Sequence, residues 1–377
     1  MKVAIAIDSF KGSLSTFEAG KAIEEGVKKV YSDAQVKITP MADGGEGTVD
    51  AICYATGGKM QKMKVHNPLG EIIESSYGLS GKTAVIEMSA AAGITLISEE
   101  ERNPLNTTTY GVGELIADAI KKGCRKFIVG IGGSATNDGG IGMLQALGFE
   151  FLDKSGEQVS FGAKGLKDIV MIKKDKVLKE LSECSFLVAC DVKNPLCGEL
   201  GCSNIYGPQK GATPEMIKDM DLWLENFAEL TKGINPDSDK EFPGAGAAGG
   251  LGFAFLSYLS GELKSGIELV IKETKLEESV KDADIVITGE GRLDGQSYMG
   301  KAPVGVAMLA KKYNKPVIAF AGGVTEDAVK CNDYGIDAFF PIVRTPCTLA
   351  EAMDKENAHK NLANTAEQVF RMIKIIM

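Results

Sequence analysis

The chain has 377 residues, of which 44% are hydrophobic and 25% are charged, and this length predicts two domains with a buried core in each. Its net charge of −9 comes from interspersed acids and bases without a long basic run, which argues against nucleic acid as a partner. No apolar run reaches the roughly 20 residues that a membrane-spanning helix needs. With eight cysteines in no disulfide or zinc pattern and only two histidines, we expect free thiols and a cytoplasmic protein with no membrane partner.

The chain opens with a strand, a polar loop and a helix. Residues 2–7, KVAIAI, are apolar after Lys2 and predict a buried strand that leads directly into the loop 8–13. The helix after this loop begins at a capping box, in which Ser15 precedes Glu18 by three positions. Ligands of open α/β sheets bind at the carboxyl ends of strands, so the loop is a candidate ligand site.

A second unit of this kind is followed by a change of pattern. A strand at 36–39 leads into a glycine-rich loop with two carboxylates at 41–48 and then into a helix. From 59 to 88 the sequence shows strand-length apolar runs separated by turn signals, and no helical pattern intervenes. This pattern of short strands and turns predicts an antiparallel meander and a domain boundary near residue 62.

The stretch 127–142, FIVGIGGSATNDGGIG, has the strongest appearance of a ligand cradle. A short buried strand opens into five glycines interleaved with small polar residues. Glycine backbone can approach a bulky anion closely, Ser134 and Asn137 supply polar groups, and the Asp138 carboxylate could hold a metal. A plain strand-to-helix turn explains the same spacing equally well.

Two further loops follow in the middle of the chain. The strand 186–189 ends next to Asp191 and Lys193, which again places an acid and a base at a carboxyl end. The stretch 244–250, GAGAAGG, has the spacing G-x-G-x-x-G of dinucleotide-binding loops, but no strand precedes it. Close packing of a helix is the favoured explanation of these glycines.

The last third of the chain resumes the alternation of strands and helices. Strands are predicted at 284–288, 317–321 and 338–343, and this rhythm indicates that the segment joins the first 60 residues in one sheet. The predicted fold class is therefore two-domain α/β. A Rossmann-like parallel-sheet domain is built from 1–62 and 268–377, a second α/β domain with the meander is inserted at 63–267, and the active site is expected in the cleft between them.

A possible phosphate-binding loop follows the strand 284–288. Residues 295–301 satisfy G-x-x-x-x-G-K, and Pro303 suits the first turn of the next helix, whose positive end would face an anion. Residue 302 is Ala where a Walker loop has the Ser or Thr that binds Mg²⁺, and six loop residues are expected between strand and motif. Any metal would then be held by carboxylates of other loops.

The combination of glycine-rich loops, cations and carboxylates is what phosphoryl transfer requires, because that reaction depends on positioning and on neutralising phosphate charge. Taken singly, each acid is better explained as a solvated surface charge. The acids in the loops are Asp8, Asp43, Glu46, Asp138, Asp191, Glu290 and Asp294, and the cations are Lys11, Lys193, Arg292 and Lys301.

Five motifs together resemble the bacterial glycerate kinases that are unrelated to P-loop and ribokinase-type enzymes. They are DSFKGSLS (8–15), MADGGEGT (41–48), GIGGSATNDGG (130–140), ACDVKNPL (189–196) and GEGRLDGQSYMGKAPVGVA (289–307). The resemblance runs in order through nearly the whole chain. It implies phosphorylation of D-glycerate by ATP with Mg²⁺, usually to 2-phosphoglycerate, in a two-domain α/β protein; it leaves open a monomer or a homodimer.

We assign roles to individual residues within this hypothesis. Lys11 and Arg292 clamp the glycerate carboxylate or the transferring phosphoryl group, Asp191 orients or deprotonates the acceptor hydroxyl, and Asp294 is the second candidate for that base. The other groups expected to bind substrate or nucleotide are Asp8, Ser9, Gly44, Gly45, Gly132, Gly133, Ser134, Asn137, Lys193, Glu290, Gly300 and Lys301. The candidate metal ligands are Asp43, Glu46 and Asp138.

Two other functions stay open at this point. Gly130 and Gly132 after a strand, with Ala135, fit a dinucleotide-dependent oxidoreductase, although Glu150 is a poor candidate for the acid that would bind the ribose. A two-domain protein that binds a small molecule without turning it over is the non-enzymatic alternative.

Overall fold

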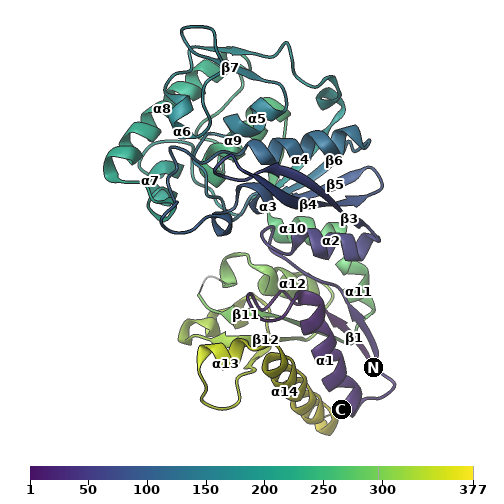
Figure 1. Cartoon of the computed structure of the whole chain (residues 1–377). Coiled ribbons are helices and arrows are strands. Elements are labelled where there is room, and N and C mark those ends of the chain that lie inside the picture. The colour runs from purple at the N-terminus through teal and green to yellow at the C-terminus, as the bar shows by residue number, and fades with distance from the viewer. Residues whose placement is uncertain (296, 377) are drawn as a thin grey trace. The chain divides into compact units, whose positions relative to one another are not determined.

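The computed structural model describes residues 1–295 and 297–376 and divides the chain into two compact units. Unit 1 comprises residues 1–43 and 50–56 and the described chain from 267 onward, and unit 2 comprises residues 44–49 and 57–266. Both ends of the chain lie in unit 1 (Figure 1). Within the described ranges, no helix has the length and apolar character that would let it cross a membrane.

Unit 1 is built on a five-stranded sheet in which every strand pairs in parallel with its neighbours. The strands, in the order in which they lie, are β13 (Ala338–Pro341), β12 (Val317–Val324), β11 (Ile285–Leu293), β1 (Lys2–Ile5) and β2 (Gln35–Ile38). This order confirms that the last third of the chain joins the first strands. The strand order reverses between β1 and β11, and open α/β sheets bind their ligands beside such a switch point.

Helices cover both faces of this sheet because apolar side chains alternate along its strands. Val3 and Ile5 of β1 pack with α1 (Thr16–Val30) and α14 (Lys355–Ile376). Ala4 faces the opposite side, where the helices are α10 (Gly266–Glu273), α11 (Leu276–Asp282) and α12 (Ala302–Lys311). Two shorter helices of this part of the chain are α2 (Thr48–Thr56) and α13 (Leu349–Met353).

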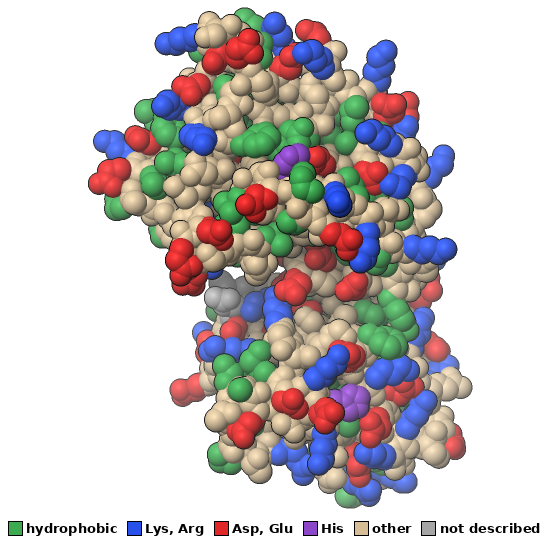
Figure 2. Space-filling model, in the orientation of Figure 1, with side chains coloured by type: hydrophobic (Ala, Val, Ile, Leu, Met, Phe, Trp, Pro, Cys, Tyr) green, Lys and Arg blue, Asp and Glu red, His purple; other side chains and the backbone are tan. Residues whose placement is uncertain are grey.

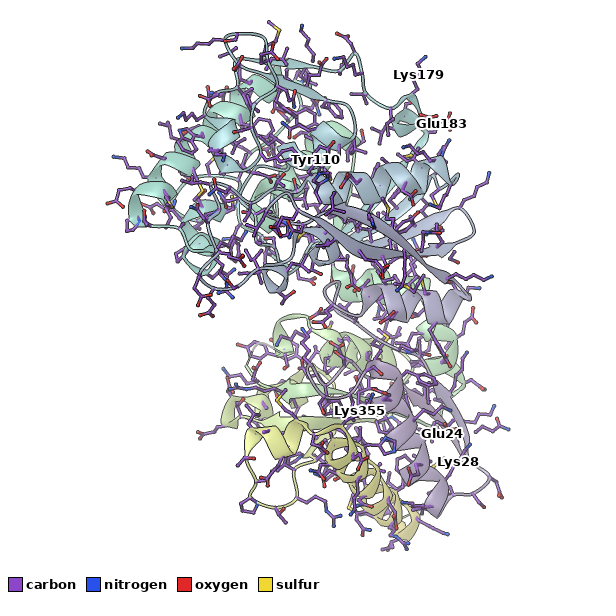
Figure 3. All side chains as sticks on the ribbon, viewed as in Figure 1. Glu24, Lys28, Tyr110, Lys179, Glu183 and Lys355 are labelled. Carbon is purple, nitrogen blue, oxygen red and sulfur yellow. The ribbon has the colours of Figure 1, made fainter. Side chains whose placement is uncertain are left out.

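The start of α1 follows the sequence prediction closely. Ser15 accepts a hydrogen bond from the backbone N–H of Glu18, and the Glu18 carboxylate accepts one from the backbone N–H of Ser15, so the predicted capping box is confirmed. Figure 3 labels Glu24 and Lys28 farther along the same helix, where an ion pair of 2.8 Å joins them. Capping and charge pairs therefore both support this helix locally.

Unit 2 contains a six-stranded mixed sheet and a small two-stranded one. The large sheet runs, in spatial order, through β10 (Glu262–Lys264), β9 (Ser185–Ala189), β6 (Lys126–Gly130), β5 (Thr83–Glu87), β4 (Ile72–Ser80) and β3 (Lys59–His66). The pairs β3–β4 and β4–β5 are antiparallel, which confirms the meander, and the others are parallel. The small sheet joins β7 (Glu150–Leu152) to β8 (Met171–Lys173) in antiparallel pairing.

The helices of unit 2 pack around a core rich in aromatic rings. Phe127 of β6 stacks on Phe186 of β9 with 4.8 Å between ring centroids, and Trp223 packs against this core while partly buried. The helices are α3 (Ser89–Ala92), α4 (Tyr110–Lys121), α5 (Ile141–Ala146), α6 (Ala163–Leu166), α7 (Cys202–Tyr206), α8 (Pro214–Lys232) and α9 (Ala247–Leu259).

One predicted loop of unit 1 is wrong. The segment from Gly289 to Leu293 was expected to be a loop, but it continues β11 and pairs in register with β12 as far as Val324. The composition was misleading, because two glycines and three charged residues within 289–294 are typical of a turn. Instead of six loop residues, only Asp294 separates the strand from Gly295, so the candidate phosphate loop follows the strand almost directly.

Candidate active site

The carboxyl ends of β1 and β11 bring predicted site residues together in unit 1. Backbone hydrogen bonds continue past the last residue of β1, from the N–H of Ala6 to Ile287 O (2.8 Å) and from the N–H of Asp8 to Gly289 O (2.9 Å). Asp8 is 4% exposed, and its Oδ1 accepts a 2.6 Å hydrogen bond from the backbone N–H of Ser9. The first loop therefore begins at the switch point of the sheet.

Carboxylates are concentrated at this point. Burial raises the pKa of the Asp8 carboxyl to about 7; the negative charges of Asp43 and Glu290 act in the same direction, while the Ser9 N–H and the Lys11 cation oppose them. Burial also raises the pKa of Glu290, although this carboxylate accepts a hydrogen bond from the hydroxyl of Ser297. These acids are thus costly to ionise together, and a bound cation would relieve that cost.

Two of the predicted cations of unit 1, Arg292 and Lys301, flank Asp294. The Arg292 Nε atom lies 3.7 Å from Asp294 Oδ2, and the Lys301 Nζ atom lies 3.8 Å from Asp294 Oδ1. The Arg292 side chain is 70% exposed, and Lys11 is also exposed, so both remain accessible to a ligand. Ion pairs of this length and exposure contribute little to stability, which leaves these cations available for a bound anion.

The candidate phosphate loop precedes α12. Lys301 occupies the position just before the helix, Pro303 lies in its first turn as predicted, and Gly300 is exposed with a positive φ of 109°. Gln296, inside the predicted G-x-x-x-x-G-K motif, lies outside the described residues. The first-turn N–H groups of a helix and the cation before it form a favourable place for phosphate.

In unit 2, the glycine-rich segment 44–49 lies across the carboxyl ends of three strands. An added Cβ atom on Gly44 (φ 90°) would lie 2.6 Å from Ala189 Cβ, and one on Gly130 would lie 2.2 Å from the Gly44 carbonyl oxygen. The backbone N–H of Val49 donates to Glu87 Oε1 at the end of β5 (2.9 Å). Gly45 is half-buried and Glu46 is exposed on this segment.

The loop between β6 and α5 exposes only its tip. Gly132 and Gly133 are exposed and Ser134 is 8% exposed, whereas Asn137 and Asp138 are completely buried. The Asn137 side-chain amide donates to Ser203 Oγ (2.8 Å), which directs this side chain inward. The sequence pattern could not separate the exposed glycines from the polar residues that turn into the core.

Asp138 has a complete set of internal donors. Its carboxylate accepts hydrogen bonds from the N–H and the hydroxyl of Thr109 (both 2.8 Å) and from the N–H groups of Gly140 and Gly142. Burial raises the pKa of Asp138, and these donors oppose the rise. The contacts favour a role in shaping the loop over the predicted role as a metal ligand.

The loop after β9 carries Asp191 and Lys193 at the surface. Both residues are exposed, and Asp191 Oδ1 accepts a hydrogen bond from the backbone N–H of Gly266 (3.1 Å). Asn194 anchors the loop: its side chain accepts from the Tyr206 hydroxyl (2.7 Å), and its carbonyl accepts from the N–H groups of two glycines, 244 and 246. Gly244 and Gly246 therefore have a structural explanation, because their N–H groups hold this loop.

Four residues that the sequence analysis missed support these loops. Glu87 holds the segment 44–49, Thr109 holds Asp138, and Asn194 holds the loop of Asp191. The fourth, Lys210, is 2% exposed and lies under the loop 131–140. A lysine between Gly207 and Gly211 was a visible signal, but a buried cation cannot be recognised from one sequence.

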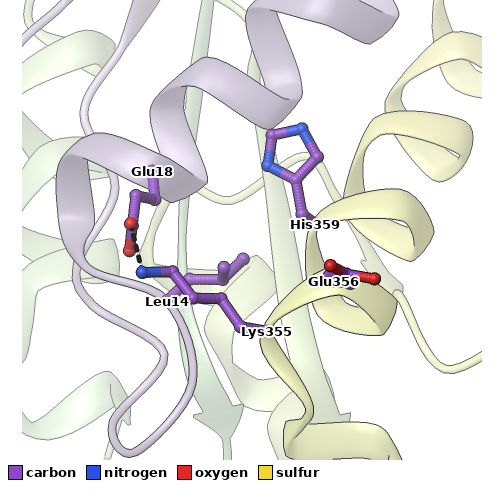
Figure 4. Close-up of a pocket in the computed structure, with 5 residues that line it drawn as sticks. All are labelled: Leu14, Glu18, Lys355, Glu356 and His359. Carbon is purple, nitrogen blue, oxygen red and sulfur yellow. Dashed lines mark ion pairs between the residues drawn. The ribbon is translucent and has the colours of Figure 1, made fainter.

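A surface hollow of about 330 Å³ in unit 1 lies apart from the predicted residues. It is lined by Leu14, Glu18, Lys355, Glu356 and His359, and the Lys355 Nζ atom pairs with Glu18 Oε1 at 2.6 Å (Figure 4). None of the predicted site residues lines it. Among residues 1–295 and 297–376, no group of three or more His, Cys, Asp or Glu side chains is arranged to hold a metal ion.

Comparisons with known proteins agree on one family. The model of the glycerate kinase family matches residues 3–374. The chain is 51% identical to a glycerate kinase of Haemophilus influenzae (99% of both chains) and 47% identical to the glycerate 2-kinase of Escherichia coli (100% of this chain, 99% of the other). A crystal structure assigned to glycerate kinase 2 of Salmonella typhimurium LT2 superposes with a TM-score of 0.91 at 46% identity, covering 100% of this chain and 98% of the other.

The match therefore includes each of the five motifs, from the loop at Asp8 to the helix that follows Lys301. At this identity and coverage, the chain belongs to the glycerate kinase family.

Proposed function

We propose that the protein is an ATP-dependent glycerate kinase that phosphorylates D-glycerate at the 2-hydroxyl group and releases ADP. The observation that carries this proposal is the family match over residues 3–374, which is supported by a relative named glycerate 2-kinase. The position of the phosphoryl group and the stereochemistry are our extension from that relative. The family also argues against the dinucleotide-dependent oxidoreductase.

The phosphate-binding part of the proposal uses unit 1. Lys301 and Gly300 precede α12, so phosphate oxygens of ATP would meet a lysine and the positive end of a helix together. Arg292 lies near the carboxyl end of β11, and its side chain is 70% exposed. It would neutralise the charge that develops on the transferring phosphoryl group. Lys11 is assigned to the glycerate carboxylate or to that same group.

The residues of unit 1 also fit a magnesium ion. Mg²⁺ takes one or two carboxylates and completes its shell with water and substrate phosphates, so a cluster of three protein ligands is not needed. The raised pKa of Asp8, caused by burial and by the neighbouring charges of Asp43 and Glu290, indicates an excess of negative charge that a cation would offset. We assign Asp43 as first ligand, with Glu46 of unit 2 as the alternative; a bound ion would shield the phosphate charge.

The acceptor hydroxyl requires a carboxylate that can accept its proton. We assign Asp191, which is exposed and fixed by the N–H of Gly266, with Asp294 as the second candidate. Lys193 on the same loop would attract the glycerate anion. The glycines of the tip, Gly132 and Gly133, would offer backbone N–H groups to a bound anion, as would the Gly44–Gly45 segment.

The test is ADP release with D-glycerate, ATP and Mg²⁺, followed by phosphorus NMR of the product. We expect ADP in step with glycerate consumption and a phosphate on the 2-hydroxyl; a 3-phosphate would correct the position only. L-Glycerate and glycerol are the matched controls for stereochemistry and for the carboxylate. Binding of glycerate without ADP release would favour the non-enzymatic alternative, and reduction of NAD or NADP would favour the oxidoreductase.

A further inference from the structure

Lys210 is a lysine enclosed in the interior of unit 2. It ends a short 3₁₀ helix (Pro208–Lys210) and is 2% exposed. Its Nζ atom donates a 2.6 Å hydrogen bond to the carbonyl oxygen of Thr136, the one hydrogen bond that this ammonium makes to residues in the described ranges. Gly211 fixes the turn after it, because an added Cβ there would lie 2.2 Å from the Arg102 carbonyl oxygen.

A buried acid of the loop 131–140, Asp138, is close enough to Lys210 to influence its charge. Burial lowers the pKa of Lys210 to about 8, while the Asp138 carboxylate and the Cys202 thiol act in the opposite direction. The ammonium therefore keeps its proton at neutral pH. Two buried ionisable side chains, Lys210 and Asp138, thus both bond to the backbone of the loop 131–140.

The hydrogen bond from Lys210 is made to Thr136, which lies close in sequence to the exposed tip of the loop. On one side of Thr136, the N–H of Ala135 donates to Ala92 O (2.9 Å); on the other, the N–H of Gly139 donates to Gly249 O (2.9 Å). Lys210 holds the carbonyl between these two anchors. The orientation of the exposed peptide groups at 132 and 133 consequently depends on contacts beneath the loop that include the lysine.

Stability alone gives no reason for a lysine at this position. An ammonium with one hydrogen bond remains poorly compensated for its lost hydration, and a methionine could fill the same space without that cost. Buried ionic groups replaced by apolar residues of similar volume often leave a protein equally stable or more stable. The presence of a lysine here therefore indicates that its hydrogen bond serves to fix the position of the loop backbone.

We propose that Lys210 is a positioning residue that fixes the loop 131–140 through the Thr136 carbonyl, so that the backbone N–H groups of its tip face the anionic substrate. This inference rests on the proposed function for its catalytic consequence. Its structural half, the fixing of the loop, can be measured on its own.

The experiment compares K210M, K210Q and a control, T231V, in the full-length protein. Methionine keeps the volume but removes the donor, whereas glutamine keeps a neutral donor. Thr231 is also buried and bonded, to Phe227 O and Tyr258, and within the described ranges its hydroxyl makes no hydrogen bond to the loop. We expect K210M to retain its Tm and to lose roughly 10- to 100-fold in kcat with little change in KM, with partial recovery in K210Q, while T231V keeps its kcat.

Amide hydrogen exchange supplies the readout that does not depend on activity. In K210M, and less so in K210Q, we expect faster exchange at Ala135 and Gly139, without change in the strands of the sheet. Unchanged kcat, or unchanged exchange at these two amides, in both variants would overturn the inference. A wild-type protein without glycerate kinase activity would defeat the proposed function instead, and the exchange rates would still decide whether Lys210 fixes the loop.

Discussion

The backbone N–H of Asp8 donates a 2.9 Å hydrogen bond to the carbonyl oxygen of Gly289, and this bond joins the residues that follow β1 to the extended end of β11. Two segments that are 281 positions apart in the chain are neighbours for this reason. The acids Asp8 and Glu290 meet here, with Lys301 close enough to influence the charge of Glu290.

The Asp8 carboxyl is expected to make stability depend on pH. Its folded pKa of about 7 lies above the usual 3.8, so its ionised form is disfavoured in the folded state. The cost is absent below about pH 4, grows between pH 4 and 7, and is complete above pH 7. D8N should raise the free energy of unfolding at pH 8 by on the order of a few kcal/mol, should leave it unchanged at pH 4, and should flatten the curve between.

Urea titrations of wild type and D8N from pH 4 to 8 measure this effect. D33N is the control, because Asp33 is an exposed acid in a turn of the same unit. Parallel curves for wild type and D8N would contradict the prediction.

The kinetics of two variants, D191N and D294N, can show which of the two candidate residues is the base. If Asp191 takes the proton, D191N should lower kcat by about 10²–10⁴-fold with a small change in KM for glycerate. D294N should act mainly on ATP, because Asp294 lies between Arg292 and Lys301. Near-normal turnover of D191N together with a loss of several orders of magnitude in D294N would exchange the two roles.

Gly289 is expected to tolerate no side chain. Its φ is 153°, and an added Cβ would lie 1.9 Å from the Phe320 carbonyl oxygen on the partner strand. G289A should therefore lower the free energy of unfolding by about 3 kcal/mol or more. G323A is the matched control in the neighbouring strand, because no atom lies within 4 Å of its added Cβ; equal effects of the two in thermal unfolding would refute the steric argument.

Two interactions at the start of α1, the capping box and the ion pair between Lys355 and Glu18, are expected to differ in how much they stabilise the protein. S15A removes the side-chain acceptor of the capping box and should cost about 1 kcal/mol. K355M removes the partner of Glu18, but the two side chains are 65% and 36% exposed, so the expected loss is well below that of the cap and should shrink further in salt. Denaturant unfolding at low and high ionic strength measures both, and the opposite ranking would contradict the prediction.

Much of the fold could be predicted from local patterns in the sequence. Apolar runs located the strands, and the pair Ser15 and Glu18 located the start of α1. The order of motifs then led to the family, which the comparisons confirm. These features are encoded within a few neighbouring residues, or in motifs that keep their sequence order.

The site was harder to predict because it depends on long-range contacts. Nothing near Asp138 in sequence indicates that Thr109 would bury it, and nothing near Gly289 indicates that Phe320 would pair with it. The glycines and charges of 289–294 predicted a loop, although residues 289–293 continue the extended strand β11. Local composition reports turns; whether a polar group faces solvent is decided by tertiary contacts.

The pairing of β1 with β11 has a consequence for synthesis of the chain. The backbone N–H of Lys2 bonds the Asp284 carboxylate, 282 residues later, and Val3 pairs with Ile285. At about 5–20 residues per second, the ribosome needs tens of seconds to make that stretch. Within that interval all of the residues of unit 2 emerge, so its sheet has time to form while β1 still waits for its partner. Strand β1 therefore gains its partner β11 only after the residues of unit 2 have been synthesised.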